Sequence, residues 1–436
     1  MLPLRFFVTC LFAATLHTVH AETAPELPDP LSLEQALSYA AAQHPALEMQ
    51  RAQLELAHGN AAAIAAEDDI SLRVDAYARW VQPGPQSPDQ EQEDHQASLL
   101  LRKPLYDFGR SSALEDAART AVNAQESLLQ ATLDQYRIQV MRAFFDVVLA
   151  DLRFGRDNEE MAVAYIRYDR TRKRMGLGQR SELEVRQTRT TYEGVRRARY
   201  HAQSQQRLTR NRLALLLGFG DKLPANLVAP ALNISVKKAP DYTLLIQAAL
   251  DQNPVLASLR AKTSAADQQL LAAQRDYWPN VDAELEWAQY QRQIGARDDW
   301  RAAIKFSVPL YNGNRVSAKI LQAQARLHQS QAQAAQGEQD LRQQLLDLWL
   351  SLDPLDAQRD QAQANYDYRQ LKLDEARTLY EQEKTADLGD SMVQTSEARW
   401  LLAQVNFEIA ITWAKIQALS GQPISLEQGL LHDKVQ

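Results

Sequence analysis

The sequence has almost no cysteine and, beyond its N-terminus, no long hydrophobic run. Cys10 is the single cysteine among 436 residues, so disulfides within the chain are excluded. A transmembrane helix needs about 18 or more consecutive apolar residues, and no such run occurs after the first residues. The formal net charge is −7 and the mean hydropathy is −0.43, so the chain has no bulk membrane character.

Catalytic signatures are missing as well. The eight histidines are scattered, and no two of them stand at metal-ligand spacing with a carboxylate partner. The sequence also contains no glycine-rich phosphate loop and no nucleophile elbow. We therefore expect no enzyme activity, no cofactor and no metal site.

The N-terminus has the pattern of a secretory signal peptide. Arg5 precedes an apolar stretch from Phe6 to Leu16, and Val19-His20-Ala21 supplies the small residues of a cleavage site. An N-terminal core helix is one alternative, and lipidation at Cys10 is another. An acidic, proline-containing segment follows, which favours cleavage before Glu22 and export of the chain.

One short motif occurs twice, roughly 200 residues apart. Pro104–Arg110 reads PLYDFGR and Pro309–Arg315 reads PLYNGNR. Pro45 and Pro254 lie in a second pair of matching segments upstream. Such a duplication predicts two homologous halves. The predicted organisation is a signal peptide (1–21), a first repeat (22–218), a linker (219–240), a second repeat (241–421) and a C-terminal tail (422–436).

Each half combines helical and strand patterns. Residues 32–68 have apolar and alanine positions at helical spacing, which predicts two helices in tandem. Alternating apolar and polar side chains then predict strands at 70–80 and 96–105. The second half alternates in the same way at 281–287 and 300–310. The expected fold class is mainly α, with two β-strands in each repeat.

The alternation alone does not place these strands, because a soluble sheet with one wet face gives the same pattern. A strand length of about ten residues, aromatic side chains near the strand ends and the export signal favour transmembrane strands. The aromatic residues are Trp80, Tyr106, Trp278, Trp300 and Tyr311. Four strands cannot close a barrel, since the smallest membrane barrels have about eight. Three chains would supply twelve strands and a lumen, so a conducting protein favours the trimer over the dimer.

Very long helices follow both copies of the motif. The helical pattern over Arg110–Met175 corresponds to roughly 100 Å at about 1.5 Å per residue. The second pattern covers Asn314–Glu383 and contains Pro354, which should kink the helix or break one turn. Each long helix leads through a turn into a return helix, and Gly218 and Gly421 are the expected stop signals.

The chain resembles the TolC family of outer-membrane efflux proteins over nearly its whole mature length. The marks are the duplication, the turn motif Pro104–Arg110 with its copy at Pro309–Arg315, and the segment Leu177–Val185. The resemblance implies a homotrimer whose pooled strands form one twelve-stranded barrel in outer-membrane lipid, above a coiled-coil tunnel in the periplasm. It also implies the exit duct of a tripartite efflux or type I secretion system, with a periplasmic adaptor (membrane fusion protein) and an inner-membrane transporter as partners. Glu383 departs from the family pattern, which usually has Gly at the second hairpin.

The two predicted hairpin tips carry opposite charge. Residues 167–212 contain fourteen Arg or Lys against four Asp or Glu, whereas residues 372–399 contain four basic against seven acidic residues. A solvated helix face is the simplest explanation, and nucleic acid is not expected as a partner of an exported chain. In a trimer, however, oppositely charged tips would alternate around one opening and could hold it shut. The candidate residues of this periplasmic gate are Arg174, Arg180, Glu182, Asp387 and Asp390.

Gly176, Leu177 and Gly178 form the second candidate site. Glycines at this place are expected in a helix–helix turn, where they supply positive φ. The family resemblance implies that a Gly-Leu at this tip contacts the helical hairpin of the adaptor. The candidate strand-to-helix turns contain Pro104, Tyr106, Gly109, Pro309, Tyr311 and Gly313.

The leading hypothesis is a passive trimeric channel in the outer membrane, powered by an inner-membrane partner. Its rival is a soluble periplasmic coiled-coil scaffold or adaptor. An adaptor would ordinarily have one helical hairpin inserted into a β-domain, whereas this sequence predicts two hairpins in tandem.

Overall fold

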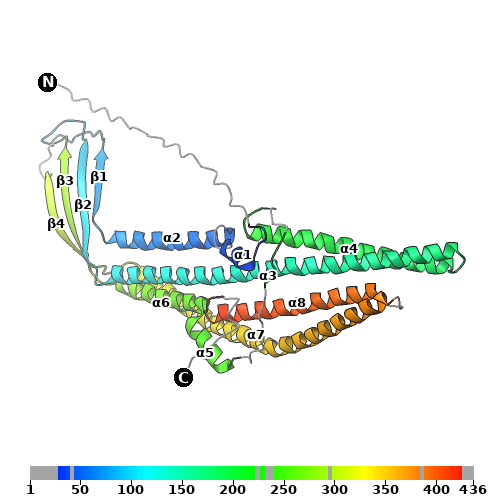
Figure 1. Cartoon of the computed structure of the whole chain (residues 1–436). Coiled ribbons are helices and arrows are strands. Elements are labelled where there is room, and N and C mark those ends of the chain that lie inside the picture. Colours follow the sequence, from blue (N-terminus) through cyan, green and yellow to red (C-terminus); the bar gives the residue numbers. More distant parts are fainter. Residues whose placement is uncertain are drawn as a thin grey trace.

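The computed structural model describes residues 28–39, 44–220, 226–230, 240–292, 297–382 and 387–424. The predicted signal peptide, Glu383 and nearly all of the predicted C-terminal tail lie outside these ranges. The molecule is elongated, with a small sheet at one end and two helical hairpins that extend toward the other (Figure 1). The hairpin of α3 and α4 reaches further than the hairpin of α7 and α8.

Helices and strands follow one another in the same order in both halves. The first half contains α1 (Leu33–Tyr39), α2 (Pro45–Glu67), β1 (Ser71–Tyr77), β2 (Gln96–Tyr106), α3 (Arg110–Gly176) and α4 (Glu182–Leu216). The second half contains α5 (Tyr242–Gln252), α6 (Pro254–Arg275), β3 (Asn280–Tyr290), β4 (Trp300–Ser307), α7 (Arg315–Glu381) and α8 (Leu388–Leu419). The long helices α3 and α7 each have 67 residues. In the described part of the chain, no helix combines the length and the hydropathy needed to cross a bilayer.

Local sequence explains several helix ends. Pro45 and Pro254 occupy the first turns of α2 and α6, where the backbone N–H has no helical partner in any case. Gly218 and Gly421 follow the ends of α4 and α8 with φ of +80° and +67°. A side chain would be strained at both positions, so glycine stops these helices as expected.

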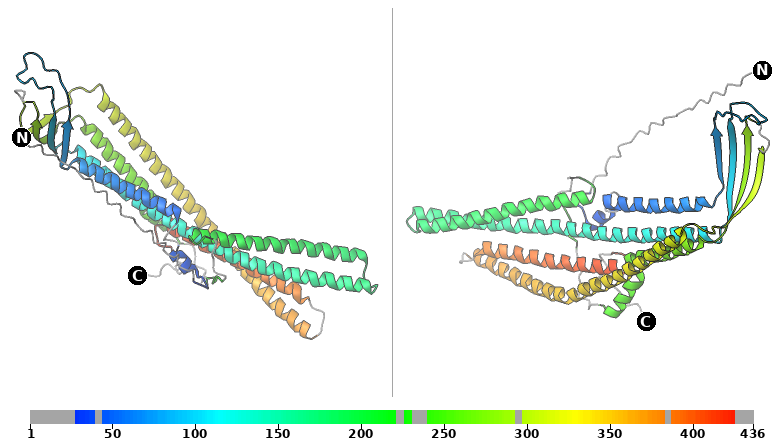
Figure 2. Two further views of the ribbon diagram at one scale, coloured as in Figure 1. Left: turned by 90° about the horizontal axis from the view of Figure 1, so that it is seen from above. Right: turned by 180° about the vertical axis from the view of Figure 1, so that it is seen from behind.

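Two strands are shorter than the alternation predicts, and of the two outcomes expected at Pro354, a kink or a break, the break does not occur. β1 ends at Tyr77, and Trp80 forms only an isolated bridge. β4 ends at Ser307, which lies opposite Asn280, the first residue of its partner strand β3 (Asn280–Tyr290). α7 contains Pro354 and continues through it without a break. The missing N–H weakens the helix locally, and α7 is visibly bent in Figure 2.

The strands form one antiparallel sheet in the order β1-β2-β3-β4. Leu99 of β2 lies opposite Val74 of β1 and Trp287 of β3, so the apolar side chains of the strands share one face. The exposed apolar side chains of this face are Leu72, Val74, Leu285, Trp287, Trp300, Ile304 and Phe306. A patch of this kind marks a surface for lipid or for another protein.

The opposite face of the sheet is polar. Ion pairs between neighbouring strands join Arg102 with Asp282, Arg301 with Glu286 and Lys305 with Glu284, at 2.9, 2.6 and 3.9 Å. Because the charges are matched across the strands, they stabilise the sheet instead of repelling one another. The sheet therefore has one apolar and one charged, polar face.

The helices below the sheet form a layer with two free edges. Contacts place α2, α3, α6 and α7 side by side in this order near the sheet, and α4, α3, α8 and α7 toward the tips. α7 thus forms one edge along its whole length and continues the edge strand β4. The other edge consists of β1, α2 and α4 (Figures 1 and 2).

The main core lies at mid-height, where α1, α4 and α8 meet α3. Val140 and Phe144 of α3 are fully buried there, and Leu213 of α4 packs in the same cluster. Phe145 stacks on Phe407 of α8, with ring centroids 4.3 Å apart. This core fixes the point from which both hairpins extend.

Candidate gate and docking site at the helical tips

The tip of the longer hairpin is an exposed turn between α3 and α4. α3 ends at Gly176, and Gly178 has a φ of +71°, which a side chain would strain. Leu177 between them is 73% exposed, although it is a large apolar residue. Ser181 then begins α4 with a capping box, in which it exchanges hydrogen bonds with Glu184. The predicted docking residues therefore lie on an exposed turn, directly before a capped helix, at the far end of the molecule.

Two of the predicted gate residues pair within this hairpin. Arg180 Nη1 lies 2.6 Å from Glu184 Oε1, and Arg186 Nη2 lies 2.5 Å from Glu182 Oε1. The hydrogen bond from the Ser181 backbone, followed by that from Arg180, lowers the pKa of Glu184. Both pairs join residues one turn apart, so they stabilise the start of α4.

The contact between the two hairpins is made by an arginine that the sequence did not single out. Arg167 Nη2 of α3 lies 3.1 Å from Asp387 Oδ2 and 3.2 Å from Asp390 Oδ2 at the start of α8. The Asp387 side chain also accepts a hydrogen bond from the Asp390 backbone and so caps α8. Arg167 lies within the basic stretch of the sequence, but sequence spacing cannot tell which of its many arginines faces α8.

Arg174 and Arg180 lie close to Arg167, but neither forms an ion pair with α8 in the described residues. They line a hollow of about 720 Å³ together with Arg167, Tyr380 and Asp387. The structure thus brings Arg174, Arg180 and Asp387 to one hollow between the hairpins, with Arg167 as the residue that bridges it. Glu182 lies outside the set of residues that line this hollow.

A second polar cluster joins α3 to α8 behind the tip. Arg156 lies 2.6 Å from Asp157, 2.7 Å from Glu160 and 2.9 Å from Glu397 of α8. Arg153 approaches Glu397 to 3.3 Å as well. Asp157 is buried, and a buried carboxylate is stable only with such partners. Sequence reasoning missed this cluster, since its residues are distributed over two distant segments.

Within the described ranges, no three His, Cys, Asp or Glu side chains converge as they would around a metal ion. The carboxylates at the tips contact arginines, so the arrangement provides electrostatic contacts between helices.

The first strand-to-helix turn is tightly packed. Pro104 and Tyr106 occupy the last positions of β2, so the turn itself begins at Asp107. The Asp107 carboxylate accepts hydrogen bonds from the backbone N–H groups of Gly109 and Ser111, at 3.0 and 2.7 Å. Gly109 has a φ of +84°, and the Arg275 guanidinium of α6 donates to its carbonyl. A hydrogen bond at this turn therefore links the first half of the chain to α6 of the second half.

The second strand-to-helix turn is open. Pro309 and Tyr311 lie between β4 and α7, and Gly313 has a φ of +64°. Leu310 and Tyr311 are 94% and 85% exposed. The two copies of the motif differ because the first lies inside the molecule and the second lies at its α7 edge.

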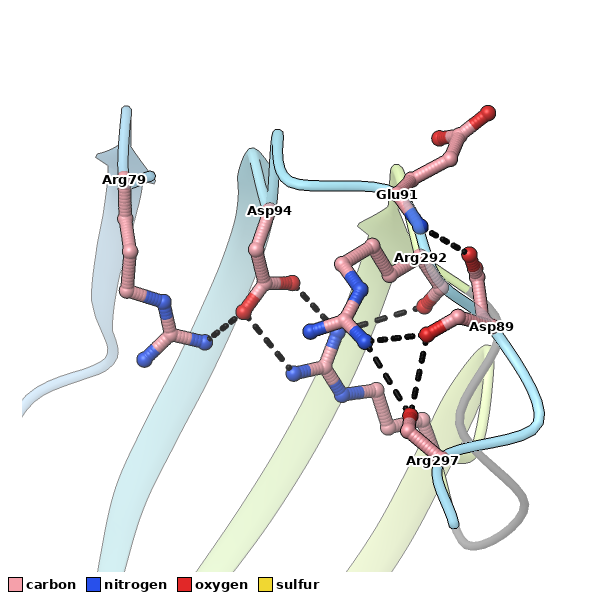
Figure 3. A network of polar contacts seen from close by, with 7 residues as sticks. Arg79, Asp89, Glu91, Asp94, Arg292 and Arg297 are labelled. Atoms are coloured by element: carbon pink, nitrogen blue, oxygen red, sulfur yellow. Dashed lines mark hydrogen bonds and ion pairs between the residues drawn. The ribbon is translucent and has the colours of Figure 1, made fainter. Parts of the chain in front are cut away.

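The loops at the far end of the sheet are connected by a compact ionic network (Figure 3). Asp94, whose side chain is almost fully buried, pairs with Arg79 and lies 2.9 Å from Arg297. Arg292, also buried, donates to Ser87 Oγ at 3.2 Å. Hydrogen bonds from Arg297 and then from Arg79 lower the pKa of Asp94 to about 2, against the opposing effect of burial.

We predict that this network keeps the loops ordered in acid. The folded-state pKa of Asp94 lies below its ordinary value of 3.8, so its stabilisation is present above that value and is lost as the pH falls through about 2. The Val81 N–H donates to the Gln92 carbonyl of the same loop at 2.8 Å. Hydrogen exchange at this amide, corrected for intrinsic rates, should show equal protection at pH 7 and pH 4. Asp94→Asn should reduce protection at both, whereas Glu91→Gln in the same loop should not. Unchanged protection in Asp94→Asn at pH 7 would contradict this role.

Sequence and structure comparisons agree with this geometry. The model of the outer membrane efflux protein family matches residues 36–219 and 245–422. The toluene efflux pump outer membrane protein TtgC and the antibiotic efflux pump outer membrane protein ArpC of Pseudomonas putida are each 24% identical over 348 residues, which cover 73% of this chain and 69% of theirs. The fold is shared with the outer membrane protein VceC of Vibrio cholerae, with a TM-score of 0.70 and 19% identity over 90% of this chain and 97% of that chain. It is also shared with the CmeC outer membrane channel of Campylobacter jejuni, with a TM-score of 0.74 and 14% identity over 91% of this chain and 88% of that chain. The chain belongs to the outer membrane efflux protein family.

Proposed function

We propose that three copies of this chain form an outer-membrane channel that serves as the exit duct of a tripartite efflux system. The observation that carries the proposal is the four-stranded sheet, which has an exposed apolar face and two unpaired edges. In a bilayer every unpaired backbone group costs several kcal/mol, so a sheet must close on itself. Four strands are too few, and three copies would supply twelve.

The strand directions suit such a closure. All neighbouring strands are antiparallel, and β1 and β4 run in opposite directions because the chain contributes an even number of strands. β4 of one copy would therefore pair with β1 of the next in the same antiparallel sense. The apolar face would then contact outer-membrane lipid, and the polar face would line the lumen.

The duct is passive and has no chemistry of its own. The helical layer would continue the barrel into the periplasm as a tunnel, and its partners would be a periplasmic adaptor and an inner-membrane transporter. The efflux functions in the names of the Pseudomonas putida relatives support this assignment. Type I secretion would use the same passage, since selection of cargo would reside in the transporter.

The gate of the tunnel would lie at the start of α8. Arg167 ties Asp387 and Asp390 to α3 within one copy, while Arg174 and Arg180 face the same hollow. In the trimer Arg174 and Arg180 would reach Asp387 or Asp390 of a neighbouring copy and hold the tips together. One exposed pair contributes about 0–1 kcal/mol, so closure would depend on its threefold repetition.

The tip around Leu177 would dock the adaptor. This turn reaches beyond the other hairpin, and its exposed leucine offers apolar surface at the end of the tunnel. Gly176 and Gly178 leave the backbone around it accessible, since neither has a side chain.

Membrane fractionation tests the assignment as a trimeric outer-membrane protein. We expect the chain in outer-membrane extracts as a trimer that dissociates only on heating, because the closed barrel leaves no free strand edge. The trimer is detected by gel electrophoresis with and without boiling. A monomer that urea washes out of the periplasm would instead support the soluble scaffold.

Charge reversal at the proposed gate should open the channel. Asp390→Arg replaces an attraction to Arg167 by a repulsion, so single-channel conductance in planar bilayers should rise. Asp251→Arg, which changes an exposed residue of α5 by the same charge, is the control and should leave conductance as in the wild type. Equal conductance of Asp390→Arg and the wild type would rule out the gate.

Docking at the tip can be tested by cross-linking. A cysteine at Leu177 should form a cross-link to the adaptor in cells, because this side chain lies at the end of the longer hairpin. A cysteine at Leu321, an exposed residue of α7 nearer the sheet, should not react with it. Efflux by the Leu177→Cys variant without any cross-link would count against docking here.

A further inference from the structure

The two free edges of the helical layer carry opposite charge in the half that leads to the tips. α4 contains eight Arg against three Glu. The second half of α7, from Glu338 to Glu381, contains ten Asp or Glu against five Arg or Lys. The two helices are separated by α3 and α8, so these charges do not neutralise one another within the chain.

The acidic residues of α7 form a regular stripe. Asp353, Asp360, Asp367, Asp374 and Glu381 follow one another at seven-residue spacing, and all five are exposed. Two helical turns contain about seven residues, so residues at this spacing lie on one side of the helix. Only Asp360 and Asp374 pair with an arginine in the described part of the chain, in each case one on α7 itself.

Exposed arginines lie on α4, which forms the opposite edge of the layer. Arg189, Arg196 and Arg207 are all exposed. Arg196 pairs with Glu193 of the same helix at 3.2 Å. Arg189 and Arg207 have no ion pair among the described residues. This edge therefore has unbalanced positive charge.

The two charged edges lie at the same height along the molecule. Tyr192 of α4 stacks on Tyr168 of α3, and the adjacent Arg167 contacts the start of α8. Thr395 lies two turns into α8, and its hydroxyl donates to the Arg369 carbonyl of α7. These contacts place Tyr192 level with the Asp374 region, so Arg189 to Arg207 of α4 lie level with Asp360 to Glu381 of α7.

We propose that the acidic stripe of α7 binds the arginine face of α4 on the next copy, forming an electrostatic seam between neighbouring chains of the channel. This inference rests on the proposed ring and identifies the residues that join it. Rotation about an axis parallel to the helices keeps every residue at its height. The stripe of one copy therefore meets the arginines of the next, and such e/g-type pairs set partner choice between helices.

Near the sheet the two edges of the layer also carry opposite charge, but there α7 is the basic edge and α2 is the acidic one. The first 23 residues of α7, from Arg315 to Gly337, contain three Arg or Lys and no acid. α2, on the opposite edge, contains three Glu and one Arg. The exposed Leu310 and Tyr311 lie just above, at the second strand-to-helix turn, and are apolar surface for the same contact. α7 is thus basic opposite α2 and acidic opposite α4.

This distribution makes the contact directional. Two chains that insert into the membrane in the same direction would align like charges if α7 met α7, so their α7 edges would repel one another and head-to-tail contact is favoured. A head-to-tail contact closes into a ring when its rotation allows. The seam thereby favours the ring over a paired dimer of exposed sheets.

The test is an exchange of charge across the seam. Variant A carries Arg189→Glu, Arg196→Glu and Arg207→Glu; variant B carries Asp360→Lys, Asp367→Lys and Asp374→Lys. The half-time of trimer dissociation is measured for the full chain in detergent at fixed temperature. Each variant should shorten this half-time by about tenfold or more, since several exposed pairs at each interface contribute about 0–1 kcal/mol each. The combination of A and B should restore most of the loss, because every pair is re-formed with the signs exchanged.

Two further measurements identify the cause. Glu126→Lys, Asp251→Lys and Asp267→Lys replace exposed residues of α3, α5 and α6. They produce the same charge change as variant B away from the two edges, and the half-time should stay within about twofold of the wild type. High salt should shorten the half-time of the wild type more than that of A or B. Equal half-times for A, B and the control, or no recovery in the combination, would overturn the seam while leaving the trimer intact. Absence of any wild-type trimer would instead refute the proposed function.

Discussion

The structure depends on backbone hydrogen bonding at two strand edges. β1 and β4 each have one side without a partner in the described chain, and the sheet between them exposes an apolar face. Water would satisfy the edges but not the apolar face, and lipid would satisfy the face but not the edges. Further copies of the same sheet would satisfy both requirements, which is the physical basis of the proposed trimer.

The helical part is organised by the same requirement. α7 continues the β4 edge and α2 and α4 continue the β1 edge, which extends one lateral surface from the sheet to the tips. The buried core around Phe144 and the Arg156 cluster fix α3 against α8. Within one copy the hairpins are therefore held together at mid-height, while their exposed tips are tied by weaker contacts such as those of Arg167.

The sequence predicted the elements well because their periodic patterns are local. The strands, the two long helices and the glycine stops follow from spacing alone, and the strand ends differed; of the kink or break expected at Pro354, the break does not occur. The partners of charged side chains could not be predicted in this way. Arg167 was one of many basic residues in its segment, and the Asp94 network joins residues about two hundred positions apart. Tertiary packing decides which charged side chains pair, and the local spacing of residues in a single sequence does not reveal that packing.

The matched ion pairs on the polar face of the sheet have a consequence for what can leave the cell. Arg102, Arg301 and Lys305 each have a carboxylate from a neighbouring strand, so the wall carries alternating charges with little net field. In the proposed barrel, solutes of either sign would meet a similar potential at the exit. Sorting of cargo by charge would then occur before the barrel, and molecules that reach it could pass irrespective of sign.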